Sequence, residues 1–456
     1  MPVPRHTLAS IVALGLAVAL PAAAQDIQVD ELGAAKSFAP GVASVSGLDP
    51  SAWAGTNAAR ATRLVTALEP SDHPVARAMQ RRVVLGGLAL PDGAGADFER
   101  ARIRAAQALA TPSEYASFAA RNERANDPRI RADARLAAGD LAGACDIGDT
   151  ISTGRGDTYW VRLRRACLLE RGETAAAELA GDLLRERGEA VELAVGRAPK
   201  GFWAEVAERD GEALRQFTSN LAVQDMDLSQ GVRFELEAAS LDPSDTGSAQ
   251  LHQLALQGDA LATARFVARA TAAGLDPDRV LARLDSVLDP NAMAAADLSL
   301  FARHAVITRD IGLLQALYRA VDDDAPERQR LALASDALGG GFYARPLGDG
   351  IEAGLEAKNP LAVHDALIAL ALGAELSESA EAALSGVGLG KGPAAWLAID
   401  AAVDRGARAE TLLRLAPLAA RASTPQEHYH LVRSLRVAGF SDLAGQAAAL
   451  ALLEAS

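Results

Sequence analysis

One pattern occurs twice between Arg129 and Gly188, as ARLAAGDLAGAC (residues 134–145) and as CLLERGETAAAEL (residues 167–179). Each copy has a helix-forming run, a glycine followed by an acid, and a second helix-forming run. The two glycine–acid pairs lie 33 residues apart, close to the tetratricopeptide period of about 34 residues. In such arrays each helical hairpin buries its apolar face only by stacking on its neighbours. The stretch therefore predicts tandem helical hairpins.

The second copy matches the tetratricopeptide pattern only in part. Trp160, Leu163 and Ala176 stand where that pattern has a large residue, a leucine and a small helix-crossing residue. Arg164 replaces the expected small residue, and the closing proline is absent. We therefore expect a degenerate unit of this type.

The first residues have the three parts of an export signal. Arg5 supplies a positive charge, and the apolar run Leu8–Leu20 is too short to span a bilayer. Three alanines ending at Ala24 precede Gln25, which predicts cleavage between these two residues. No cysteine lies there, so an acylated-cysteine anchor is not expected. Charged residues interrupt every later apolar run, so the sequence predicts an exported, periplasmic protein without a membrane span in its mature part.

An oxidising compartment changes how the two cysteines of this chain, Cys145 and Cys167, are interpreted. They lie 22 residues apart, in the second helix of one predicted unit and the first helix of the next, which pack together in a helical stack. Exported cysteine pairs commonly form disulfides, and this spacing fits neither a CxxC redox motif nor a zinc site. The sequence predicts a disulfide between them. Two buried free thiols, or a catalytic or metal role, are the alternatives.

Composition narrows the class of protein. The 456 residues are 50% hydrophobic but only 4% aromatic, and 59 acids outnumber 45 bases. Loss of Arg5 with the signal would change the net charge from −14 to about −15. Phosphate binding needs a basic patch and single-stranded nucleic acid needs aromatic stacking surfaces, so nucleic acid is not an expected ligand. Ala- and Leu-rich runs with few β-branched stretches predict an all-α fold.

Short polar residues followed by proline predict the starts of several helices, because the polar side chain caps exposed N–H groups and proline suits the first helical position. Two of the threonines are followed three residues later by Glu, which predicts capping boxes at Thr111–Glu114 and Thr424–Glu427. The predicted starts are Asp49-Pro50, Thr111-Pro112, Asp127-Pro128, Asp276-Pro277, Asp289-Pro290, Asn359-Pro360 and Thr424-Pro425. Asp324, ahead of Pro326, is also expected to cap a helix.

A second ladder of glycines runs through the C-terminal third with a spacing of 33 residues: Gly340, Gly373, Gly406 and Gly439. Each is preceded, seven residues earlier, by an apolar residue, and three of the four close a helix-like run. The helical hairpins expected from these signals are approximately 247–273, 291–320, 325–357, 360–385, 392–420 and 425–454.

The expected organisation is an α-solenoid of degenerate tetratricopeptide-like hairpins in two segments. After the signal peptide, 1–24, a flexible leader is expected over 25–48. The N-terminal repeat segment covers 49–240 and the C-terminal one 249–456. The turn-rich stretch LDPSDTGS, residues 241–248, is the expected hinge between them.

Motifs that carry chemistry are missing from the sequence. The histidines form no HExxH motif, and His428 and His430, two residues apart, face different sides of a helix. No GxSxG nucleophile motif occurs. The glycine-rich loop Gly339–Gly350, with two aromatic residues, is a candidate ligand loop, although a long turn inside an atypical repeat is the simpler interpretation. No catalytic residue, cofactor or metal is predicted.

Together with the exported start, three segments resemble a group of exported helical-repeat, tetratricopeptide-like proteins of α-proteobacteria: SAWAGT around Trp53, YWVRLRRACLLERGE with the Cys145/Cys167 pair, and SLRVAGFSDLAGQAAALAL near the end. Some proteins of this kind carry an antifreeze-glycopeptide name. The Ala-Ala-Thr tandem repeats of such glycopeptides are absent here, and the alanines follow the pattern of packed helices. The resemblance implies an exported helical-repeat fold and assigns no catalytic residue.

Two functions from different classes fit the sequence. The first is a non-enzymatic periplasmic scaffold that holds a protein partner, with a role in maintenance of the cell envelope, because helical solenoids provide extended binding surfaces. The alternative is a peptidoglycan-acting enzyme or accessory factor, because the superhelical scaffolds of lytic transglycosylases are similar in composition. No lysozyme-like catalytic segment accompanies that similarity. The sequence assigns neither the identity of the partner nor an oligomeric state.

Overall fold

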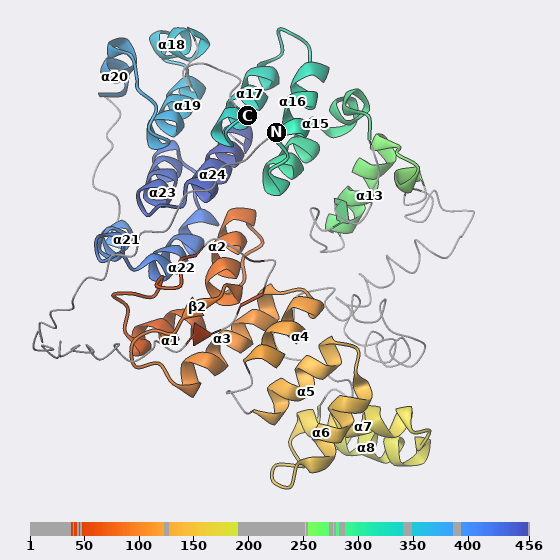
Figure 1. The fold of residues 1–456 in the computed structure, drawn as a ribbon. Coiled ribbons are helices and arrows are strands. Elements are labelled where there is room, and N and C mark those ends of the chain that lie inside the picture. Colours follow the sequence, from red (N-terminus) through yellow and green to blue (C-terminus); the bar gives the residue numbers. More distant parts are fainter. Residues whose placement is uncertain are drawn as a thin grey trace, which may run out of the picture. The chain divides into compact units, whose positions relative to one another are not determined.

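The computed structural model describes residues 38–456 except 40, 43–44, 46–47, 123–126, 190–250, 252–253, 273–276, 278–279, 282–287, 341–348, 386–393 and 455–456. Helices make up nearly all of the regular structure in these residues (Figure 1). The exception is a short antiparallel ladder in which β1, Phe38–Ala39, pairs with β2, Leu88–Ala89. The prediction of an all-α protein is confirmed.

The helices fall on either side of the undescribed residues 190–250. Before them lie α1 Ala58–Thr66, α2 Pro74–Leu85, α3 Ala96–Leu109, α4 Pro112–Arg121, α5 Pro128–Ala137, α6 Leu141–Thr150, α7 Thr158–Glu170 and α8 Thr174–Glu186. After them lie α13 Ala260–Ala272, α15 Pro290–Thr308, α16 Ile311–Ala320, α17 Pro326–Ala337, α18 Asp349–Glu356, α19 Pro360–Ala371, α20 Glu378–Ser385, α21 Ala394–Asp404, α22 Arg408–Ala419, α23 Pro425–Val437 and α24 Ser441–Glu454.

Five of the predicted helix starts have the expected geometry. At each, proline occupies the first turn and the side chain before it accepts a hydrogen bond from a helical N–H; the capping residues are Thr111, Asp127, Asp289, Asn359 and Thr424. Both predicted capping boxes are present. Local side-chain chemistry therefore sets where these helices begin.

Two predicted helix starts are wrong, and a third lies outside the described residues. Residues 50–55 form turns, because Asp49 Oδ1 accepts a hydrogen bond from Ser51 N at 2.7 Å and closes a tight turn instead of a helix. Helix α17 is preceded by Ala325, which makes no side-chain cap, so Asp324 is not its cap. Asp276 lies outside the described residues.

Most of the predicted glycine turns share one backbone conformation. Gly139, Gly172, Gly373, Gly406 and Gly439 all have φ between 68° and 86°, the left-handed region that favours glycine. At the first of these, Asp140 N donates to Arg135 O at 2.8 Å, the long-range bond of a Schellman cap. These glycines therefore end one helix and direct the chain into the next.

The first member of the C-terminal glycine ladder differs from its prediction by one residue. Gly339 has the positive φ, 95°, and Gly340 follows it. A Cβ atom at Gly340 would lie 2.1 Å from Ser335 Oγ, so packing against that hydroxyl explains the second glycine.

From α3 to α8 each helix packs against the next one along the chain. This is the nearest-neighbour packing expected for stacked helical hairpins. The run includes the stretch 129–188 that predicted repeats. The small residue expected to pack at Ala176 is exposed, however, and its neighbour Ala177 is buried instead.

The C-terminal helices are packed in a different way. Helix α24 is buried over ten consecutive residues, Leu443–Leu452, and contacts α2, α15, α17, α19 and α23. In a simple solenoid each repeat contacts only its neighbours. One helix surrounded by five others is instead the centre of a local core, so a solenoid along the whole chain is not confirmed.

Small residues allow this central position. Gly445 is in such close contact with α17 that an added Cβ atom would lie 2.3 Å from Ala337 O. Five alanines between Leu443 and Leu452 keep the rest of α24 thin. The N-terminal helix α2 also packs against α22, beside which it lies in Figure 1. Arg82 of α2 and Asp442 of α24 form an ion pair between residues 360 positions apart.

Much of the expected organisation into segments falls on residues outside the described ranges. The signal peptide 1–24, its cleavage position and the hinge 241–248 all lie outside the described residues. Part of the expected leader 25–48 is described. There Phe38–Ala39 pairs with β2, and Val42 N donates to Leu85 O at 2.8 Å. The last part of the leader thus packs against the end of α2.

Candidate functional site

The two cysteines are brought together between neighbouring helices of the stack. Cys145 lies on α6 and Cys167 on α7, with their Sγ atoms 2.01 Å apart and their Cα atoms 5.7 Å apart. This is the distance of a disulfide bond, and the helices are the second of one predicted unit and the first of the next. Arg171, at the end of α7, adds an ion pair to Asp149 of α6 at 2.8 Å.

A buried carboxylate links α5 to α7 in the same stack. The Tyr159 hydroxyl of α7 donates to Asp133 Oδ1 of α5 at 2.6 Å, and the Arg129 guanidinium lies 4.4 Å from the centre of the Tyr159 ring. Asp133 is only 5% exposed. Burial raises its pKa to about 7, although the hydrogen bond from Tyr159 favours the ionised form. Asp133 is therefore a proton-binding group inside the stack.

We expect Asp133→Asn to reduce the pH dependence of stability. The folded chain holds the Asp133 proton more tightly than the unfolded chain does, so protonation of Asp133 stabilises the fold. This contribution to the unfolding free energy is complete below the ordinary Asp pKa near 3.8 and is lost as the pH rises through about 7. The unfolding free energy of the natural protein, relative to that of the variant, should fall between pH 5 and 7 by on the order of 1 kcal/mol per pH unit. Urea unfolding at pH 5, 6, 7 and 8 measures this difference.

The control for that series is Asp146→Asn, which removes an exposed acid from α6 of the same stack. Its difference from the natural protein should stay constant between pH 5 and 8. A constant difference for Asp133→Asn would show that Asp133 does not bind a proton in this range.

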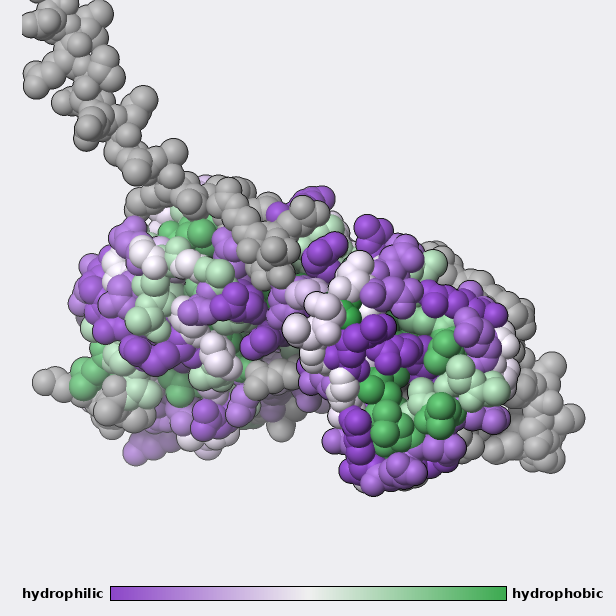
Figure 2. Space-filling view, turned by 90° about the horizontal axis from the view of Figure 1, so that it is seen from below, coloured by the Kyte–Doolittle hydropathy of each residue, from purple (hydrophilic) through white to green (hydrophobic). Residues whose placement is uncertain are grey.

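Helix α8 has one face packed on α7 and another that is exposed and carries two leucines beside Asp182 and Glu186. Leu184 is fully buried against Val161 of α7. On the other face Leu179 is 71% exposed and Leu183 is 37% exposed, one helical turn apart. Exposed Ala175 and Ala176 extend this α8 face toward the start of the helix. Figure 2 shows apolar side chains, in green, exposed among hydrophilic ones on the side of the molecule seen from below.

A second buried carboxylate holds α22 to α1. The Glu410 side chain is 1% exposed, and Arg414 contacts its Oε1 at 2.9 Å, Arg405 at 3.5 Å and Arg60 at 3.7 Å. The buried Thr56 hydroxyl donates to Glu410 Oε2 at 3.0 Å. Burial opposes ionisation, but the hydrogen bonds from Arg414 and Thr56 hold the pKa of Glu410 below its ordinary value. Glu410 is thus kept as an anion, which suits a structural ion cluster and not a general acid.

The histidines near α23 contact different partners, as their spacing predicts. His428 Nδ1 lies 3.3 Å from His364 Nε2 of α19, and the His430 ring lies 5.4 Å from the Trp396 ring of α21. Within the described ranges, no three His, Cys, Asp or Glu side chains are arranged to hold a metal ion. In the same part of the chain, no helix has the length and apolarity needed to cross a membrane.

The sequence led to the cysteine pair but missed Asp133 and the α8 face. A signal for Asp133 exists: it lies three residues after Ile130 and four before Ala137, at apolar helical spacing, so a buried acid could have been predicted there. For α8 the leucines are visible in the sequence, but which of them are covered depends on how the helix packs on α7. The predicted cleavage residues Ala24 and Gln25 are not described.

Comparison with protein-family models, with curated proteins and with solved structures finds no match for this chain. The class of this protein is therefore described from its own fold and contacts. It is an all-α protein in which a cysteine pair at disulfide distance joins two helices of a stack, and the last described helix of that stack exposes two leucines.

Proposed function

We propose that this chain is a non-enzymatic scaffold of the bacterial periplasm that binds a protein partner through the exposed face of α8. The observation that carries the proposal is the exposure of Leu179 and Leu183 on a helix whose opposite face is packed. Exposed leucines at positions i and i+4 of a helix are anchors of the kind that helix-in-groove recognition uses. The finer fold proposed for residues 96–186 is a short stack of tetratricopeptide-like hairpins.

The contacts beneath α8 support its use as a binding surface. The cysteine pair joins α6 to α7, the Asp133–Tyr159 hydrogen bond joins α5 to α7, and α7 carries α8. A surface held in place by such contacts loses little conformational entropy on binding. We propose that binding through the α8 face serves maintenance of the cell envelope.

Site-specific photocrosslinking in the native cell envelope tests the proposal. A photoreactive residue at position 179 should give a discrete adduct with another protein. The matched control is position 397, because Leu397 on α21 is a leucine of similar exposure, 60%. The double substitution Leu179→Lys/Leu183→Lys should abolish the adduct formed from a photoreactive residue at position 176. Equal labelling from positions 179 and 397 would contradict a specific α8 interface.

Export is tested separately. The protein should appear in the periplasmic fraction, and its N-terminal residue there should be Gln25. A protein that keeps residues 1–24 and stays in the cytoplasmic fraction would rule out the proposed location without testing the α8 face.

A further inference from the structure

Arg60, Arg405 and Arg414 form an arginine cluster that carries more positive charge than the acid it surrounds, Glu410. The near nitrogen atoms of Arg414, Arg405 and Arg60 lie 2.9, 3.5 and 3.7 Å from the same carboxylate oxygen, Oε1. Three nitrogen atoms this near to one oxygen are also near one another. Among the described residues, no other acid lies within ion-pair distance of these arginines. Three positive charges therefore face one negative charge, which leaves two uncompensated.

The arginine cluster covers the Glu410 carboxylate and is itself open to water. The Glu410 side chain is 1% exposed, whereas those of Arg60 and Arg405 are each 40% exposed. The distances from these two arginines to Oε1 exceed the usual N–H···O range of about 2.7–3.2 Å, and neither guanidinium donates a hydrogen bond to any described residue. Each guanidinium has several N–H donors. Most of those donors therefore remain available to a ligand.

Contacts between backbone segments hold the arginine cluster in place. Ala409 N, at the start of α22, donates to Ala52 O at 2.8 Å. Gly55 has a φ of 74°, and a Cβ atom there would lie 3.1 Å from Arg405 O. Glycine at this position therefore lets the turn before α1 pack closely on the turn between α21 and α22. A site whose backbone is set before a ligand arrives loses little conformational entropy on binding.

We propose that the arginine cluster binds a phosphate monoester. Such a group carries about two negative charges near pH 7, which match the charge that Glu410 leaves uncompensated. Its oxygens accept several hydrogen bonds, and planar guanidinium groups donate to phosphate in pairs. The cluster belongs to α1, to α22 and to the turn before α22. It is separate in sequence from α8, so this inference does not rest on the function proposed for the α8 face.

Other small anions fit the arginine cluster less well. A sulfate ester has the same tetrahedral shape but only one negative charge, so one positive charge would stay unpaired. A dicarboxylate spreads its two charges over separate planar groups, whereas the three guanidinium groups gather around one point. The chain has 59 acids against 45 bases and repels anions in general, so binding depends on this local excess of positive charge.

Titration calorimetry of the full chain at pH 7.5 and low salt tests the proposal with three probes. Ethyl phosphate, ethyl sulfate and malonate compare a tetrahedral dianion, a tetrahedral monoanion and a dicarboxylate. Ethyl phosphate should bind saturably, more tightly than malonate, and at least about tenfold more tightly than ethyl sulfate, as expected for one further charge contact of modest strength. No saturable binding of ethyl phosphate, equal affinity for ethyl sulfate, or tighter binding of malonate would overturn the proposal.

Two variants locate the binding. Arg60→Gln and Arg405→Gln each remove one charge from the cluster and should lower ethyl phosphate affinity about fivefold, as for a partly exposed ion pair. The matched control is Arg63→Gln, which removes an exposed charge one turn further along α1 and should change the affinity less than about twofold. Circular dichroism confirms that each variant folds. Unchanged affinity in both cluster variants, or equal losses in all three variants, would overturn the assignment to this cluster.

The same phosphate chemistry can come from a soluble ester or from a lipid headgroup, and vesicles distinguish these sources. Sedimentation with vesicles that contain phosphatidic acid, reversed by ethyl phosphate and lost in Arg60→Gln/Arg405→Gln, would support the proposal with a lipid as the ligand. Saturable binding of ethyl phosphate without sedimentation would support it with a soluble ester. Sedimentation that the double variant retains and ethyl phosphate does not reverse would contradict a phosphate site at the arginine cluster.

Discussion

Replacing Glu410 with Gln is expected to lower the free energy of unfolding by about 3 kcal/mol, because it removes one partner from a buried ion cluster. Three arginine side chains and the Thr56 hydroxyl surround this carboxylate, and its own side chain is 1% exposed. Gln keeps the shape but not the charge, so the arginines lose their common partner. Since these arginines are 30–40% exposed, water solvates them in part, which places the effect at the lower end of the range for buried pairs.

Urea unfolding at pH 7 measures this effect. Glu356→Gln, which neutralises an exposed glutamate at the end of α18, serves as the control and should change stability by less than about 0.5 kcal/mol. The pKa of Glu410 is lowered in the folded protein, so its contribution is present above the ordinary Glu pKa of 4.5 and is lost as the pH falls below it. The difference between the natural protein and Glu410→Gln should therefore shrink below pH 4.5. A variant as stable as the natural protein at pH 7 would show that the cluster gives no net stability.

Loss of the Cys145–Cys167 link is expected to cost about 3 kcal/mol on the chain-entropy model, because the cross-link restricts the unfolded chain over a separation of 22 residues. Both cysteine side chains are buried, so the suitable variant is Cys145→Ala/Cys167→Ala, which introduces no buried hydroxyl. Chemical unfolding of the natural protein with and without dithiothreitol should show the same loss as the variant. The variant itself should not respond to dithiothreitol.

The chemical state of the two cysteines is tested directly by counting free thiols, which distinguishes a disulfide from two buried free thiols. Thiol titration of the unfolded, unreduced protein should find no free thiol. Two free thiols, together with identical unfolding in the presence and absence of dithiothreitol, would contradict a disulfide in the exported protein. Limited proteolysis adds a local readout, since residues 151–157 between α6 and α7 should be cleaved faster once the link is removed.

Most helix boundaries of the described chain could be predicted because their signals are local. Thr111 and Thr424 satisfy N–H groups within their own helices, and the glycines at 139, 172, 373, 406 and 439 supply a backbone angle that other residues rarely adopt. The errors have local reasons too. Asp49 hydrogen-bonds to Ser51 in a turn, and Gly339 takes the conformation expected of Gly340 because it is the residue that follows the C-cap Leu338 of α17.

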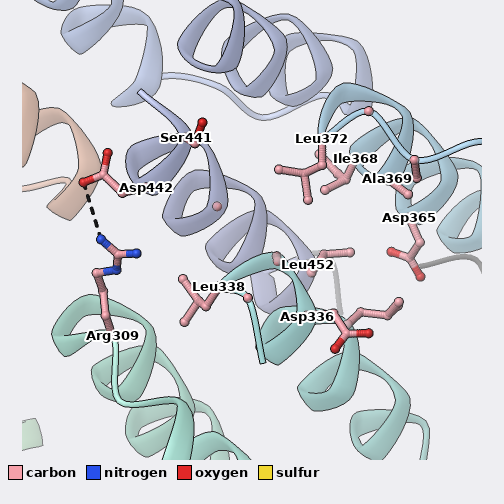
Figure 3. Close-up of a pocket in the computed structure, with 16 residues that line it drawn as sticks. Arg309, Asp336, Leu338, Asp365, Ile368, Ala369, Leu372, Ser441, Asp442 and Leu452 are labelled. Carbon is pink, nitrogen blue, oxygen red and sulfur yellow. Dashed lines mark hydrogen bonds and ion pairs between the residues drawn. The ribbon is translucent and has the colours of Figure 1, made fainter. Parts of the chain in front are cut away.

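The candidate sites were less predictable. The cysteine pair followed from the alternation of helices, since both residues lie on elements adjacent in the chain. Glu410 could not be recognised as a cluster centre, because Thr56 and Arg60 are about 350 residues away in the sequence. A cavity of about 610 Å³ (Figure 3) is likewise lined by α17, α19 and α24 together with Arg309. No local pattern indicates that these elements line one cavity.

Local sequence signals were enough to predict that this protein is helical, where many of its described helices begin and end, and which two cysteines approach each other. These properties depend on interactions within a few residues or between adjacent helices. Tertiary packing, in contrast, was needed to find that α24 contacts five other helices, that α2 packs against α22, and that two leucines of α8 are exposed. Burial depends on which surfaces meet in space, and an alanine-rich helix can pack closely against many different partners.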